Sequence, residues 1–105
     1  MGECFNSSVS YVGQYQNYLT ALFNYPMYYT ISNVFGSHQS MYNIRTQYNA
    51  EASAFKDVDA LGVFVDNHDN PRFLYNHANN KVGLKQAVVF ALTSRGIPFT
   101  YYGTE

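Results

Sequence analysis

The amino-acid sequence predicts an α/β fold built on a parallel sheet. Three short apolar segments alternate with segments of helical periodicity, an order that is typical of parallel sheets. The middle apolar segment, Leu61 to Val65, contains no polar residue that would mark a solvent-facing side. Strands of parallel sheets are buried on both faces and show this pattern. No linker, repeat or low-complexity segment divides the 105 residues, so we expect a single domain.

The first predicted strand is Ala21 to Tyr25, and a helix is expected to begin near Pro26. Proline suits the first helical turn because the N–H group that it lacks would have no helical partner there. Gly36 is a suitable end for this helix. Its apolar residues recur at helical spacing: Met27, Ile31 and Val34.

A second helix is expected after Ser40, with Met41, Ile44 and Tyr48 on one face. The following segment, Ala50 to Asp59, is polar, and its pattern favours neither helix nor strand.

The last predicted helix is Lys81 to Ser94, with a broad apolar face that runs from Val82 through Leu92. Arg95 is expected in its last turn, Gly96 ends it, and Pro98 prevents its continuation. The segment Ile97 to Tyr102 is then predicted to be the third strand.

Composition excludes several classes of function. Six Lys and Arg residues against seven Asp and Glu residues give a net charge of -1, with no basic patch for nucleic acid. The longest apolar run, Ala87 to Leu92, is too short to span a membrane. The single cysteine, Cys4, excludes an internal disulfide and a zinc site built from cysteines.

Tyrosine is abundant in a long uncharged segment. No Asp, Glu, Lys or Arg occurs from Cys4 to Ile44, yet this stretch holds seven of the eleven tyrosines. One interpretation is a tyrosine-rich core whose hydroxyl groups bond at its edges. The other is a neutral stacking surface that suits sugars. Composition alone favours the core, since tyrosine is usually at least partly buried.

The most informative string is FVDNHDNPRF, Phe64 to Phe73, which begins within the Leu61 to Val65 strand. In parallel α/β folds, functional side chains gather where strands end. Asn70-Pro71 forces a turn that would hold His68 and Asp69 at this edge. An Asn, Asp and Pro cluster can also be a turn with no further role.

This string resembles the motif at the end of the seventh barrel strand in α-amylases of glycoside hydrolase family 13. Met1-Gly2-Glu3 resembles the end of the fifth strand, and Gly96 to Glu105 resembles the eighth. Tyr15 to Asn17 and Phe23 to Tyr29 resemble the sixth-strand region. The resemblance therefore covers nearly the whole chain.

The resemblance implies the C-terminal half of a (β/α)8 TIM barrel, from the end of the fifth strand to the eighth. It implies retaining endo-hydrolysis of α-1,4-glucosidic bonds, with α-glucans such as starch, glycogen and maltooligosaccharides as partners. Calcium is expected for a full-length family member, with ligands mostly outside this chain. The missing N-terminal barrel half would be required for activity. The alternative is a truncated, inactive protein that at most binds glucan.

The resemblance also assigns roles to residues. Glu3 matches the general acid/base, and Asp69 matches the carboxylate that stabilises the transition state. His68 matches a substrate-binding histidine, and Asn67 and Arg72 match supporting residues at the substrate site that orient the carboxylates. The nucleophilic aspartate would lie upstream of Met1, and no metal ligand is assigned. Three further residues match no motif: His38 and His77 are expected at the surface or at helix ends, and Cys4 as a small buried thiol.

Overall fold

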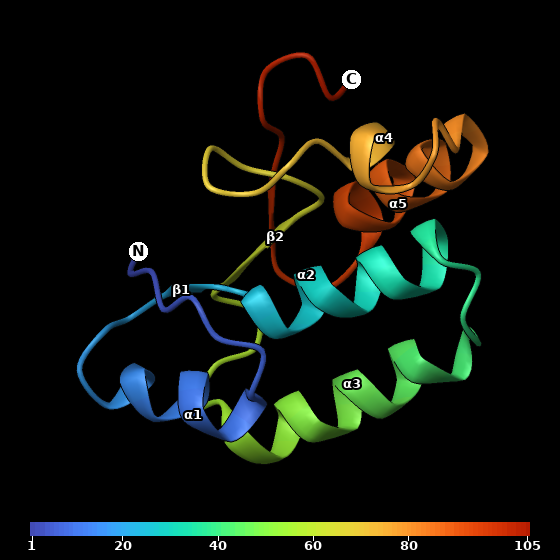
Figure 1. The fold of residues 1–105 in the computed structure, drawn as a ribbon. Helices are drawn as coiled ribbons and strands as arrows, with labels where there is room; N and C mark the ends of the chain where they lie inside the picture. Colours follow the sequence, from blue (N-terminus) through green and yellow to red (C-terminus); the bar gives the residue numbers. More distant parts are fainter.

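The computed structural model describes residues 1–105 and confirms the α/β class (Figure 1). The strands β1 (Leu22–Phe23), β2 (Leu61–Phe64) and β3 (Ile97–Phe99) form a parallel sheet in the order β1-β2-β3. Gly2 adds a parallel bridge to Leu22, so the chain start lies beside β1 at the edge of the sheet. Helices connect the strands, as parallel pairing demands.

The structure contains five α-helices, and none is long and apolar enough to cross a membrane. Helices α2 and α3 run side by side, and α4 and α5 lie on the other side of α2 from α3 (Figure 1). A 3-10 helix (Gln14–Asn17) follows α1, and a π-helical turn (Ser32–Gly36) extends α2. The helices are α1 (Val9–Gly13), α2 (Tyr25–Ile31), α3 (Tyr42–Ala54), α4 (Phe73–Asn76) and α5 (Lys81–Thr93).

The predicted start of the helix after the first strand is confirmed in α2. The side chain of Asn24 caps the helix by accepting a hydrogen bond from the N–H of Met27 at 3.0 Å, and Pro26 lies in the first turn. The end differs from a plain helix because a π-helical turn reaches Gly36. A Cβ atom at Gly36 would lie 2.4 Å from the ring of His77, so this close approach requires glycine.

Helix α3 corrects two expectations. It continues to Ala54, so the first half of the polar segment from Ala50 to Asp59 is helical. Met41 is 59% exposed, and it does not join Ile44 and Tyr48, which pack into the core. The reason is that Met41 precedes the first helical residue and lies outside the helical repeat.

Helix α5 has the predicted extent but a narrower buried face than its sequence suggests. The residues that it buries are small: Gly83, Ala87 and Ala91. Among its larger apolar residues, Val82, Val89 and Leu92 are exposed, whereas Leu84, Val88 and Phe90 are partly buried against the core. Apolar periodicity therefore located the helix correctly, while its packing surface depends on how close its neighbours approach.

Three further expectations need correction. The predicted strand from Ala21 to Tyr25 is too long, because β1 covers only Leu22–Phe23 and Tyr25 begins α2. Strand β3 ends at Phe99, so the predicted strand to Tyr102 is too long. Arg95 lies beyond α5 and pairs with exposed Asp59. The short helices α1 and α4 were not predicted, because each has too few residues to show a period.

Strand β2 joins the three apolar clusters of the core. Val63 belongs to the largest cluster, which collects residues from α2, α3, α4 and α5. Leu61 packs with Val12, and Phe64 packs with Tyr25. All four residues of β2 are buried, so the prediction of a strand covered on both faces is confirmed.

Candidate active site

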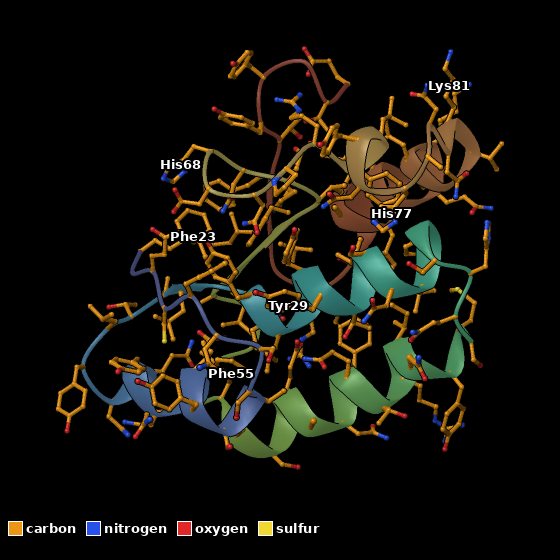
Figure 2. The ribbon with its side chains drawn as sticks, viewed as in Figure 1. Phe23, Tyr29, Phe55, His68, His77 and Lys81 are labelled. Atoms are coloured by element: carbon orange, nitrogen blue, oxygen red, sulfur yellow. The ribbon has the colours of Figure 1, made fainter.

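Two segments that are far apart in the sequence meet at the carboxyl ends of the strands. Glu3 follows the bridge between Gly2 and β1, and Asp66 to Arg72 follow β2. Because the strands are parallel, their ends lie at the same edge of the sheet. Figure 2 shows His68 on the loop after β2, on the same side of the molecule as Phe23.

The predicted residues Glu3, His68 and Asp69 come together at this edge. One carboxylate or imidazole atom from each lies within 4.8 Å of the other two. The His68 Nε2 atom is 3.5 Å from Asp69 Oδ2. All three side chains are exposed and thus open to a ligand from solvent.

Asn67 organises the loop that carries His68 and Asp69. Its Oδ1 accepts hydrogen bonds from the backbone N–H of Asp69 at 3.1 Å and of Asn70 at 3.0 Å. The Asn70 side chain donates to the same oxygen at 2.7 Å. The Nδ2 of Asn67 donates to the hydroxyl of Tyr25 at 2.8 Å. The loop conformation is therefore tied to the start of α2.

Tyr25 is a site residue that sequence reasoning missed. Its side chain is fully buried, and its hydroxyl donates to Glu3 Oε1 at 2.5 Å. Burial, and secondly the bond to Glu3, raise the pKa of Tyr25 far above its usual range, so its hydroxyl stays neutral. The sequence offered a weak signal, because Tyr25 is one of seven tyrosines in an uncharged segment.

Arg72 pairs with the carboxylate of Asp66, which is outside the cluster of Glu3, His68 and Asp69. Its Nε lies 3.2 Å from Oδ2 of buried Asp66, and its Nη2 donates to the carbonyl of Tyr102 at 2.7 Å. Thr104 completes the arrangement by donating to Asp66 Oδ1 at 2.6 Å. Arg72 thus fastens the chain after β3 to the end of β2 and does not touch Asp69.

A hollow of about 170 Å³ opens beside the cluster. Phe23, Phe64 and Phe99 form its apolar part, with the Phe23 and Phe99 ring centroids 4.9 Å apart. An apolar surface flanked by a few polar groups is typical of small-molecule sites. The polar lining residues are Glu3, Asp66, Asn67, His68, Thr100 and Tyr101.

The cluster is a poor match for calcium. Calcium takes six to eight oxygen ligands, whereas this group includes the imidazole nitrogen of His68. One oxygen of Glu3 already accepts the hydrogen bond from Tyr25. We therefore assign no calcium ligand among these residues.

The remaining candidates lie away from the hollow. His77 ends α4, and its Nε2 is 2.9 Å from Ser32 Oγ; burial lowers its pKa. His38 is exposed. Cys4 is half-buried, and burial raises the pKa of its thiol, which makes it less reactive. The tyrosines divide between core and surface: Tyr25 and Tyr28 are buried, while Tyr11, Tyr18 and Tyr42 are exposed.

Comparison with known proteins identifies the family. The description "Alpha amylase, catalytic domain" matches residues 1–105. A beta/alpha-amylase of Paenibacillus polymyxa is 49% identical over 113 residues, covering 100% of this chain and 9% of that protein. A cyclomaltodextrin glucanotransferase of Niallia circulans is 43% identical over 76 residues, covering 71% of this chain and 10% of that protein.

A solved structure agrees with the sequence comparisons. The α-amylase of Malbranchea cinnamomea superposes with a TM-score of 0.88 at 29% identity, covering 99% of this chain and 22% of that one. The chain thus spans less than a quarter of each of these relatives. With the family description matched over its whole length, this chain belongs to the α-amylase catalytic domain family of glycoside hydrolases.

Proposed function

We propose that residues 1–105 supply part of the active site of a retaining endo-hydrolase of α-1,4-glucosidic bonds in starch and glycogen. In this proposal they run from the end of the fifth strand to the eighth strand of a (β/α)8 barrel, as its C-terminal half. The observation that carries the proposal is the convergence of Glu3, His68 and Asp69 within 4.8 Å beside a hollow at the strand ends. Active sites of such barrels lie at this face.

Retaining glycosidases use one carboxylic acid to protonate the leaving oxygen and a second carboxylate as nucleophile. In the proposed mechanism, Glu3 donates its proton to the glycosidic oxygen and later accepts one from the attacking water. Asp69 accepts hydrogen bonds from sugar hydroxyls and stabilises the positive charge that develops on the ring. His68 donates a hydrogen bond to the sugar beside it.

The nucleophile would come from outside these residues. Asp66 is the other carboxylate at the hollow, but its side chain is only 3% exposed. One of its oxygens accepts from Thr104 and the other lies against Arg72, so neither is free to attack a sugar. Calcium, if the longer protein binds it, would likewise be held mostly by residues outside this chain.

Apolar side chains on β3 and α5 are exposed, which supports the proposal that these residues belong to a longer barrel. Ile97 and Phe99 are 42% and 38% exposed, although β3 belongs to the sheet. We propose that further strands cover this face, and that residues 1–105 alone aggregate and lack amylase activity. Unpaired strand edges recruit other chains. A monodisperse monomer of residues 1–105 with slowly exchanging strand amides, or with activity on starch, would contradict this.

The function is tested in the longer protein that contains these residues. Glu3→Gln and Asp69→Asn should each lower kcat on starch, because removal of general acid catalysis alone costs on the order of 10²- to 10⁴-fold. Exposed Asp57 lies outside the hollow, so Asp57→Asn is the matched control and should leave kcat unchanged. A loss of less than about threefold in both site variants would contradict the assignment. NMR of the first-formed product should show the α-anomer.

Transglycosylation is the second candidate, favoured by the similarity to the glucanotransferase. The two reactions share the same steps until water or a sugar hydroxyl attacks the intermediate. Chromatography of the products from starch separates them: linear maltooligosaccharides support hydrolysis, whereas cyclic products support transfer. An inactive, glucan-binding protein would give neither product.

A further inference from the structure

We propose that Tyr25 is a positioning residue for this reaction, whose buried hydroxyl holds the Glu3 carboxyl in place and links it to the loop of His68 and Asp69. The inference rests on the proposed role of Glu3 as general acid/base.

The hydroxyl of Tyr25 stands at the centre of a chain of hydrogen bonds. It donates to Glu3 Oε1 at 2.5 Å and accepts from Asn67 Nδ2 at 2.8 Å. Asn67 Oδ1 in turn accepts from the backbone N–H of Asp69 at 3.1 Å. A neutral phenol has one proton to donate, and Tyr25 commits it to the carboxyl group. The ends of two different strands are thus connected through one side chain.

The ring of Tyr25 is held rigidly. It is fully buried, and the rings of Phe5, Phe64 and Tyr28 contact it edge-on at centroid distances of 4.8, 5.2 and 6.1 Å. Tyr25 is also the first residue of α2, whose start is capped by the Asn24 side chain. The hydroxyl therefore cannot move without repacking this cluster.

Glu3, by contrast, needs an external support. Its side chain is exposed and follows the single bridge made by Gly2. A long carboxylic side chain samples several rotamers unless a contact orders it. Catalysis requires the reacting groups at about 3–3.5 Å, and a displacement of about 1 Å can cost roughly 100-fold in rate. The Tyr25 hydroxyl provides the ordering contact.

The hydrogen bond from Tyr25 to Glu3 also determines which oxygen of Glu3 carries the acid proton. Because Oε1 accepts the hydrogen of Tyr25, the proton that Glu3 donates is carried by Oε2. When Glu3 is ionised, the Tyr25 bond stabilises the carboxylate. The other charged or titratable groups beside Glu3 are Asp69 and His68.

The test compares Tyr25→Phe with Tyr28→Phe in the longer protein. Tyr28 is buried in the same helix and stacks on Phe64 at 5.2 Å, but its hydroxyl does not contact Glu3. We expect Tyr25→Phe to lower kcat on starch by roughly 10- to 100-fold, with a change in KM of less than about threefold. The alkaline limb of the pH profile of kcat/KM should move to higher pH, because the ionised Glu3 loses a donor.

Leaving-group dependence separates positioning from general loss of structure. An α-maltotriosyl fluoride needs little acid assistance, so Tyr25→Phe should be much less impaired on it than on starch. Tyr28→Phe should match the wild type in all three measurements. If Tyr25→Phe fails to fold, 3,5-difluorotyrosine at position 25 keeps the ring and strengthens the donor, and the alkaline limb should move to lower pH.

The inference is overturned if Tyr25→Phe matches Tyr28→Phe in kcat, pH profile and leaving-group dependence while Glu3→Gln is inactive. It is also overturned if the difluorotyrosine variant leaves the alkaline limb in place. A wild-type protein without activity on α-glucans, or a fully active Glu3→Gln variant, would instead contradict the proposed function.

Discussion

Strands β2 and β3 are paired neighbours with opposite exposure. Phe64 and Phe99 are directly opposite in the register, yet Phe64 is 2% exposed and Phe99 is 38% exposed. Strand β2 has a strand on each side and contacts α2 and α5, whereas β3 has a strand on one side only. Two apolar segments of similar composition thus become an interior strand and an edge strand, according to the neighbours that each one has.

The comparison matters for the proposed function because both strands contribute to the hollow beside Glu3, His68 and Asp69. Phe64 and Phe99 both line it. The interior strand also presents the loop of His68 and Asp69, and Phe64 packs against Tyr25. The chain after β3 returns to the end of β2 through Arg72. A substitution on either strand is therefore expected to alter the geometry of the site.

The largest effect should come from truncating the paired phenylalanines. In the longer protein, Phe64→Ala should lower the free energy of unfolding by about 3–5 kcal/mol. Phe99→Ala should cost a similar amount if further strands cover β3, as we propose. Urea denaturation of both variants measures this. A Phe99→Ala cost of less than half that of Phe64→Ala would show that β3 remains an exposed edge.

Alanine substitutions at two glycines near these strands should lower the free energy of unfolding by smaller amounts, which differ from each other. Gly96 precedes β3 with φ +114°, and a Cβ atom there would lie 2.5 Å from the carbonyl oxygen of Leu61. Gly103 has φ +72°, and its nearest neighbour would be Arg72 Nη2 at 3.4 Å. We expect Gly96→Ala to cost roughly 2–3 kcal/mol and Gly103→Ala about 1 kcal/mol. Equal shifts in urea midpoint would contradict this.

The smallest effect concerns a buried carboxyl group in α3, the helix that precedes β2. Glu51 is 2% exposed and accepts hydrogen bonds from Asn24 and Gln47, each at 2.9 Å. Burial raises its pKa, and the hydrogen bonds from Gln47 and Asn24 and the charge of Arg95 offset this rise only in part. Its contribution to stability is therefore present below the ordinary pKa of about 4.3 and is lost as pH rises through the raised value.

Glu51→Gln keeps an oxygen acceptor and removes the buried charge. The free energy of unfolding of Glu51→Gln should therefore increase relative to that of the wild type as pH rises from 4 to 7. Urea denaturation at several pH values would measure this difference. Glu51→Ala is the control, and it should cost about 1–3 kcal/mol because Asn24 loses its partner. A constant difference between Glu51→Gln and the wild type across this range would contradict the assignment.

The sequence by itself determined the features that depend on neighbouring residues in the chain. Asn24 and Pro26 start α2 through local capping and a preset backbone angle, and both follow from residue type. The apolar run of β2 predicted its burial correctly. The motif after it located the loop where Glu3, His68 and Asp69 meet, and the resemblance to α-amylases was sufficient to assign the family.

Only the tertiary structure decided which side chains contact one another across the sheet. Arg72 was expected to orient the carboxylates of the substrate site, and only the tertiary structure shows that its partner is buried Asp66, with the chain after β3 passing beside it. Tyr25 became the partner of Glu3, although nothing in its local sequence distinguishes it from Tyr28. Hydrogen bonds of this kind depend on distances between segments that the sheet register sets. Periodicity describes one segment at a time, so it cannot supply them.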